Sequence, residues 1–132
     1  MKFLKITTAT VTALALGAGI TMASSHGNKY VMSAPLNGQT FIMYQNHFSL
    51  YFYANDEPGV SKCYGECAEK WPPAILPADT PMPESYTLIP RKDGSMQIAY
   101  KGRPMYLYSG DKKIGDINGV GLGGVWELAI PF

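Results

Sequence analysis

The sequence predicts a mainly β fold, with a small α+β fold as the alternative. Two pseudo-repeats form one compact antiparallel sheet domain with a short helix-loop insertion. Three observations support this prediction. The pattern Tyr-x-Tyr-x-x-Asp occurs twice, each time followed by a tryptophan at the same interval. Short apolar runs alternate with Asn-Gly and Asp-Gly turns, which are typical of β-hairpins. Only one segment has the composition of a helix, and two prolines end it.

The repeated pattern defines the domain. Its two copies comprise Tyr51, Tyr53, Asp56 and Trp71, and then Tyr106, Tyr108, Asp111 and Trp126. Two copies are too few for a solenoid, and each half is too small to bury a core of its own. We therefore expect a single domain over residues 24–132, with pseudo-repeats at about 40–75 and 95–130.

The strands are expected where apolar runs lie between turn sequences. Their expected ranges are 30–36, 40–44, 48–54, 86–91, 96–100, 105–108 and 125–130. The first two flank Asn37-Gly38, whose residue types suit a type I′ turn because both positions require positive φ. Residues two apart on a strand share a face, so Tyr51 and Tyr53 should project to the same side.

The N-terminus has the pattern of a secretory signal peptide over residues 1–23. Lys2 and Lys5 precede an uncharged, mostly apolar stretch from Ile6 to Ile20, and Thr21-Met22-Ala23 is a small-x-small cleavage site. After cleavage we expect no stable membrane span. The alternative is that the apolar stretch is retained as an anchor.

Export directs the protein to the periplasm or the medium. No cysteine follows the apolar stretch, so the sequence predicts no lipid anchor through a lipobox. The formal net charge is +1 and charged residues make up 16% of the chain. A nearly neutral chain lacks the basic surface of a nucleic-acid-binding protein, so we expect no nucleic-acid partner.

The two cysteines, Cys63 and Cys67, lie in the expected helical segment from Ser61 to Trp71, with Ser61 as its N-cap. In an oxidising compartment such a pair is most simply a structural disulfide. The spacing C-x-x-x-C matches neither a thioredoxin-like site nor a c-type haem site. A redox-active dithiol and a metal site that uses Cys63, Cys67 and His47 remain alternatives, with copper or haem as the cofactor.

The repeated aromatic residues allow two interpretations. In the first, the tyrosines and tryptophans pack in a pseudo-symmetric core, and Asp56 and Asp111 accept hydrogen bonds from turn amides. In the second, the same eight residues form an aromatic platform with carboxylates at its rim, for a flat or sugar-like ligand. A third possibility is an enzyme in which Asp56 and Asp111 act as paired carboxylates.

The chain resembles a known family over about residues 40–130. The first half of the shared pattern runs from Tyr51 through Cys63 and Cys67 to Trp71-Pro72-Pro73. The second half runs from Arg91-x-Asp93-Gly94 through Tyr106 and Asp111 to Val125-Trp126. These motifs resemble the bacterial and archaeal secreted repeats described as predicted lipoproteins with a Yx(FWY)xxD motif. The resemblance implies an exported, repeat-built domain and supplies no catalytic residues.

The sequence thus predicts an exported, non-enzymatic module of the cell envelope that binds or assembles with a small ligand or an envelope protein, and that carries no cofactor. The alternative is a periplasmic protein that handles redox equivalents, copper or haem through Cys63 and Cys67. No Ser-His-Asp set supports an enzyme, because the chain has only two histidines.

Overall fold

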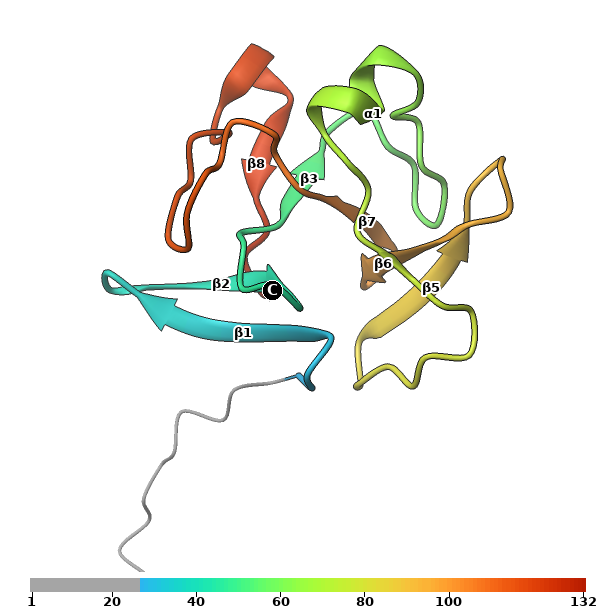
Figure 1. Cartoon of the computed structure of the whole chain (residues 1–132), viewed down its shortest axis with the longest axis horizontal. Coiled ribbons are helices and arrows are strands. Elements are labelled where there is room, and N and C mark those ends of the chain that lie inside the picture. The colour runs from blue at the N-terminus through green and yellow to red at the C-terminus, as the bar shows by residue number, and fades with distance from the viewer. Residues whose placement is uncertain (1–26) are drawn as a thin grey trace, which may run out of the picture.

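The computed structural model describes residues 27–132, and the predicted signal peptide at residues 1–23 lies outside them. The prediction of a mainly β fold is confirmed (Figure 1). The strands are β1 (Val31–Leu36), β2 (Gln39–Tyr44), β3 (Tyr51–Tyr53), β4 (Ile75–Leu76), β5 (Tyr86–Pro90), β6 (Met96–Tyr100), β7 (Arg103–Tyr106) and β8 (Trp126–Leu128). The helices are α1 (Glu66–Lys70) and the 3₁₀ turn η1 (Leu122–Gly124).

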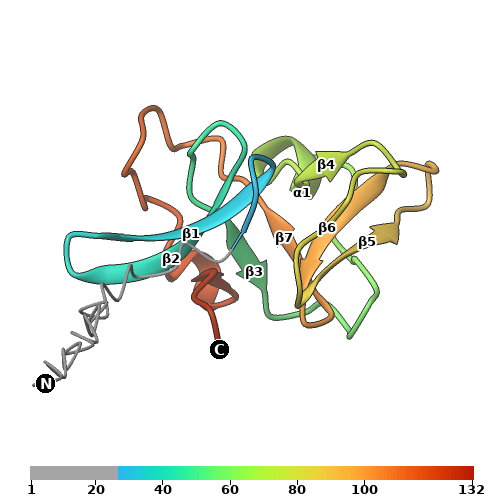
Figure 2. The same ribbon diagram turned by 90° about the horizontal axis from the view of Figure 1, so that it is seen from below.

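The strands form a two-stranded hairpin and a six-stranded antiparallel sheet. β1 pairs with β2 across Asn37 and Gly38, whose φ values of 52° and 81° confirm the expected turn. The larger sheet has the order β4-β6-β7-β3-β8, and β5 pairs with β6. Figure 2 shows β3 and β7 at the centre, with the β1–β2 hairpin on one side and the β5–β6 hairpin on the other.

A pseudo-twofold relationship connects the two halves. Tyr51 on β3 lies directly opposite its counterpart Tyr106 on β7. Each half also closes against the other with matching main-chain bonds: Ile42 N–H donates to the Ala129 carbonyl, and Ile98 N–H donates to the Ala74 carbonyl, both at 2.8 Å. Neither repeat therefore completes its sheet alone, as expected for halves that share one core.

The central strands separate two layers of the core. Leu50, Phe52 and Met105 pack on one side with residues of both hairpins. Tyr51 and Tyr106 pack on the other side with Trp71, Trp126 and Cys63. This division follows from the alternation of side chains along β3 and β7. Tyr53 packs against the same cluster as Tyr51, which confirms that these two tyrosines share a face.

The expected helix from Ser61 to Trp71 is wrong in its first half. The helix begins only at Glu66, and its N-cap position is Gly65 with φ 59°, so Cys63 lies in the preceding loop. Ser61 does not cap the helix, because its side chain is buried and bonded to Tyr106 and Arg91. Tertiary hydrogen bonds thus override the local helix signal.

Within residues 27–132, no helix has the length and hydropathy required to cross a membrane.

Candidate functional site

Two reciprocal hydrogen bonds connect the repeats at the centre of the molecule. The Tyr51 hydroxyl of the first repeat donates to Asp111 Oδ2 of the second at 2.7 Å. The Tyr106 hydroxyl of the second repeat donates to Asp56 Oδ2 of the first at 2.8 Å. Burial and the neighbouring carboxylate raise the pKa of both phenols, so each stays protonated and remains a donor at physiological pH.

The second oxygen of each carboxylate accepts a hydrogen bond from a main-chain N–H group. Asp56 Oδ1 accepts the Lys62 N–H at 2.7 Å, and Asp111 Oδ1 accepts the Asn118 N–H at 2.9 Å. Each aspartate therefore fixes the loop that follows its own strand and also holds the tyrosine of the other repeat. These contacts account for the Tyr-x-Tyr-x-x-Asp spacing in structural terms.

The remaining aromatic residues form a continuous stack on the same face. Trp71 and Trp126 lie parallel, with ring centroids 3.7 Å apart and planes 5° apart. Tyr53 stacks on Trp126, and Tyr108 stacks on Trp71, each with centroids 4.4 Å apart. The order Tyr53–Trp126–Trp71–Tyr108 thus follows the pseudo-twofold, with one tyrosine at each end.

This packing leaves little free aromatic surface. Tyr51 and Tyr106 are fully buried, and the two tryptophans cover each other's faces. Among the six aromatic residues of the repeated motif, Tyr53 and Tyr108 are the two that are half-buried. Of the eight candidate residues, the structure places Tyr51, Tyr106, Trp71 and Trp126 in the core.

A shallow hollow lies on the pseudo-twofold, between α1 and η1. It has a volume of about 310 Å³, and both tryptophans contribute to its lining together with Lys70, Tyr108 and Leu122. In Figure 1, α1 and the segment that enters β8 stand at the same end of the molecule. We call the hollow between α1 and η1 the tryptophan hollow.

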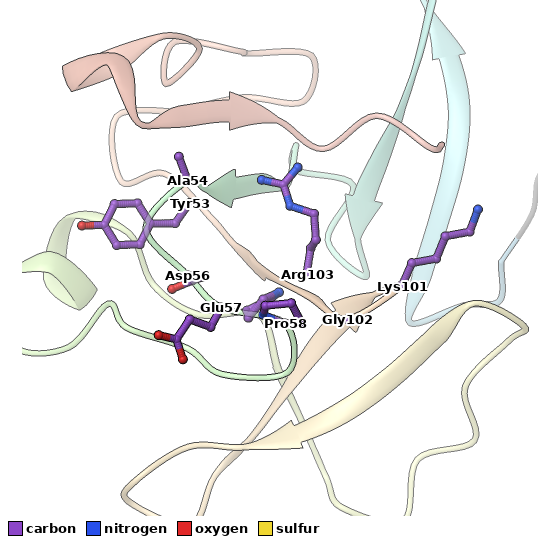
Figure 3. A pocket seen from close by; sticks show the side chains of 9 residues that line it. Tyr53, Ala54, Asp56, Glu57, Pro58, Lys101, Gly102 and Arg103 are labelled. Carbon is purple, nitrogen blue, oxygen red and sulfur yellow. The ribbon is translucent and has the colours of Figure 1, made fainter.

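A second hollow lies between the repeats and combines an aromatic ring with charges of both signs. It has a volume of about 250 Å³ and is bordered by Tyr53, Asp56, Lys101, Arg103 and neighbouring residues. Figure 3 shows Tyr53 and Asp56 on one side and Arg103 on another, while Lys101 points away. We call this the Tyr53 hollow.

The two aspartates differ in exposure although their bonds match. Asp111 is buried, whereas Asp56 is half-buried and borders the Tyr53 hollow. Burial raises the pKa of Asp56 above its ordinary value, although hydrogen bonds from Lys62 N–H and the Tyr106 hydroxyl act in the opposite direction. Only the first-repeat carboxylate is thus placed where it can meet a ligand.

Arg103 supplies the opposite charge from the second repeat. Its guanidinium lies 4.2 Å from the centre of the Phe52 ring and pairs with Glu127 Oε1 at 2.5 Å, which fixes its plane. A guanidinium has five N–H donors, so the ion pair leaves donors for a ligand. Sequence reasoning missed Arg103, because its position in the hollow depends on the pairing of β3 with β7.

Arg91 opens the second half of the family pattern, but sequence reasoning gave it no role. It is buried, and its guanidinium donates to Ser61 Oγ at 2.9 Å, Gln97 Oε1 at 3.0 Å and the Cys63 carbonyl at 2.8 Å. Ser61 Oγ is in turn hydrogen-bonded to the Tyr106 hydroxyl. The buried positive charge of Arg91 therefore lies close to Asp56 and to the loop that carries Cys63. An arginine in a short apolar strand was the available signal.

The cysteines and the histidine do not come together. Cys63 and Cys67 form a disulfide, as predicted, and no free cysteine is present in the described part of the chain. His47 is exposed in the turn between β2 and β3. Residues 27–132 contain no group of three or more His, Cys, Asp or Glu side chains that could hold a metal ion.

Comparison with known proteins agrees with this two-part architecture. A model of a secreted repeat of unknown function matches the chain twice, over residues 38–75 and 87–129. The chain belongs to this family of secreted repeats. No curated protein and no solved structure matches it. The family assignment indicates export and confirms the predicted relationship.

Proposed function

We propose that this secreted repeat protein is a non-enzymatic binding module that holds a sugar-like ligand in the Tyr53 hollow. The observation that carries the proposal is the convergence of Tyr53 and Asp56 from the first repeat with Arg103 from the second. Small-molecule sites combine a concave, partly apolar surface with a few fixed polar groups. The volume of about 250 Å³ suits a ligand of one or two rings.

Each of the three residues offers a different contact. Tyr53 presents a ring whose other face is fixed against Trp126. Asp56 has hydrogen bonds to both carboxylate oxygens, and each oxygen keeps a further lone pair for a ligand hydroxyl. Arg103 borders the hollow from the second repeat, and its ion pair with Glu127 leaves some of its five N–H donors for a ligand. A ring with an apolar face and several hydroxyls uses all three, whereas a purely apolar or strongly charged ligand does not.

The duplication supports a site that is complete only when both repeats are present. Asp56 belongs to the first repeat and Arg103 to the second, and their separation is fixed by the β3–β7 pairing. This also supplies rigidity, since the side chains project from strands and from a hydrogen-bonded turn. Preorganised polar groups lose less entropy when they bind a ligand.

Titration calorimetry with soluble neutral oligosaccharides, such as chitin and cellulose fragments, tests the proposal. The wild type should bind at least one of them. Asp56→Asn should weaken binding by about tenfold, the loss expected for one charge-assisted hydrogen bond of about 1.5 kcal/mol.

The chain offers matched controls because its repeats are similar. Asp111→Asn alters the equivalent tyrosine bond but does not border the Tyr53 hollow, so it should leave affinity unchanged. Tyr53→Ala removes one end of the aromatic stack, and Tyr108→Ala removes the other end. Tyr108→Ala is therefore the matched control for Tyr53→Ala. Equal losses in both members of a pair would reject the Tyr53 hollow as the site, and no binding by any probe would reject the ligand class.

For localisation we propose cleavage after Ala23 and release into the periplasm or the medium. The family of secreted repeats supports export, and the absence of a lipobox cysteine in the sequence supports a form without a lipid anchor. The intact mass of the protein exported by a bacterial host tests this. A mass equal to that of residues 24–132 less two hydrogens agrees with cleavage and a disulfide, and a mass that includes residues 1–23 contradicts it.

A further inference from the structure

The disulfide between Cys63 and Cys67 has no counterpart in the second repeat. The second repeat places Tyr108, Asp111 and Trp126 as the first places Tyr53, Asp56 and Trp71, with the same chain length between aspartate and tryptophan. At the positions that correspond to the cysteines, the second repeat has Asn118 and Leu122. The same architecture thus forms in this molecule without a covalent bond.

Contacts that do not involve sulfur hold the cysteine loop. The Arg91 guanidinium donates to the Cys63 carbonyl and stacks 4.2 Å from the centre of the Tyr64 ring. The Tyr64 hydroxyl accepts the Lys92 N–H at 3.1 Å, and the Lys62 N–H donates to Asp56. If the disulfide opens, these contacts remain, so the loop can stay in place.

The two sulfur-bearing residues differ in access. Cys63 is completely buried beside Trp71 and Tyr106, whereas Cys67 is partly exposed on α1, in which no residue is buried. An incoming thiolate therefore meets Cys67 first. Attack there makes Cys63 the leaving thiolate, on a residue whose main-chain carbonyl is bonded to the cationic Arg91. A positive charge beside a thiolate lowers the pKa of the thiol and speeds its departure.

We propose that Cys63–Cys67 is a reversible thiol–disulfide exchange site for a dithiol partner. One thiolate of the partner attacks Cys67 Sγ, the Cys63–Cys67 bond breaks, and Cys63 leaves as the thiolate. The second thiol of the partner then attacks its own sulfur in the mixed disulfide and releases Cys67. The chain gains two electrons and two protons, and the partner becomes a disulfide. Arg91 stabilises the Cys63 thiolate by its charge.

Exchange with a small dithiol and with reduced thioredoxin tests the proposal on the folded protein. We expect the pair to be reduced and reoxidised in full, with near-ultraviolet circular dichroism of the tryptophan stack unchanged. In the Cys63→Ser variant, Cys67 should form a mixed disulfide with glutathione readily. In the Cys67→Ser variant, Cys63 should react at least tenfold more slowly because it is buried.

The role of Arg91 has a separate readout. In the Cys67→Ser background, Arg91→Gln should raise the pKa of the Cys63 thiol, and a shift of one pKa unit changes the thiolate fraction about tenfold. Arg91→Lys retains a positive charge and should restore part of the shift, which controls for a packing defect. Two results would overturn the proposal: a pair that stays oxidised with excess reduced thioredoxin, or reduction that abolishes the circular dichroism signal of the stack.

Discussion

The Tyr51 hydroxyl donates to Asp111 Oδ2 at 2.7 Å across the junction of the two repeats. The equivalent contact in the opposite direction joins the Tyr106 hydroxyl to Asp56 Oδ2 at 2.8 Å. The repeated motif therefore acts between halves and not within one half. A single copy would leave both its tyrosine and its aspartate without these partners, and unpaired buried polar groups are costly.

Tyr51→Phe should lower the free energy of unfolding by about 1.5–3 kcal/mol, because it leaves one oxygen of the buried Asp111 without its donor. Urea denaturation of Tyr51→Phe, Asp111→Asn and the double variant measures the coupling between the two residues. We expect a coupling energy above about 0.5 kcal/mol. Strict additivity would show that the contact does not stabilise the fold.

Gly119→Ala should destabilise the protein through the tryptophan stack. A Cβ atom at this position would lie 2.6 Å from Cη2 of Trp71, a distance that packed atoms do not tolerate. We expect a loss of about 1–3 kcal/mol and a change in tryptophan fluorescence. Trp71→Phe removes the atoms in conflict, so the same glycine substitution should cost less in that background. An equal cost in both backgrounds would place the defect elsewhere.

Replacement of both cysteines by alanine should leave a folded protein. The ring closed by the disulfide is very short, and the chain-entropy model assigns it a stabilisation of about 2 kcal/mol. Thermal unfolding with near-ultraviolet circular dichroism checks this, with reduced wild type as the control. Complete loss of structure in the double variant would mean that the bond is essential to the fold and would count against exchange as its role.

The pH dependence of stability should carry opposite contributions from two aspartates. Burial raises the folded-state pKa of Asp56, so stability falls as pH rises from the unfolded pKa, about 3.9, through the folded pKa. Hydrogen bonds from the Lys112 and Lys113 amides lower the pKa of Asp116, so its contribution is present above the unfolded pKa and is lost as pH falls through the folded pKa.

The Asp56→Asn variant isolates the first contribution. Because it removes the titrating group, the stability of the wild type relative to the variant should decrease as pH rises from acid to neutral. Denaturation at a series of pH values measures this difference. Carboxyl chemical shifts provide an independent check, in which Asp56 titrates above the ordinary aspartate range and Asp116 below it. A relative stability that increases with pH would contradict the assignment.

The sequence allowed the β class, the two repeats, the hairpin turn at Asn37-Gly38 and the Cys63–Cys67 bond to be predicted, since each depends on local pattern or spacing. It also indicated that Tyr51 and Tyr53 share a face. It did not reveal that Tyr51 and Tyr106 each bond to the aspartate of the other repeat, because that depends on the register of β3 against β7.

The candidate site was only partly predictable for the same reason. Tyr53 and Asp56 stood out through their motif, but Arg103 enters the site through strand pairing, and the buried contacts of Arg91 with Ser61 depend on tertiary structure. The expected helix began too early because Ser61 looked like an N-cap. In the structure its hydroxyl is bonded to Tyr106 and Arg91, which no local signal encodes.

The most direct test of the proposed function is a map of amide chemical-shift changes on titration with a neutral oligosaccharide. We predict changes centred on Tyr53, Asp56 and Arg103, with the equivalent residues Tyr108 and Asp111 unaffected. Changes centred instead on Trp71, Tyr108 and Leu122 would assign binding to the tryptophan hollow, and equal changes in both repeats would contradict a site made by Asp56 and Arg103.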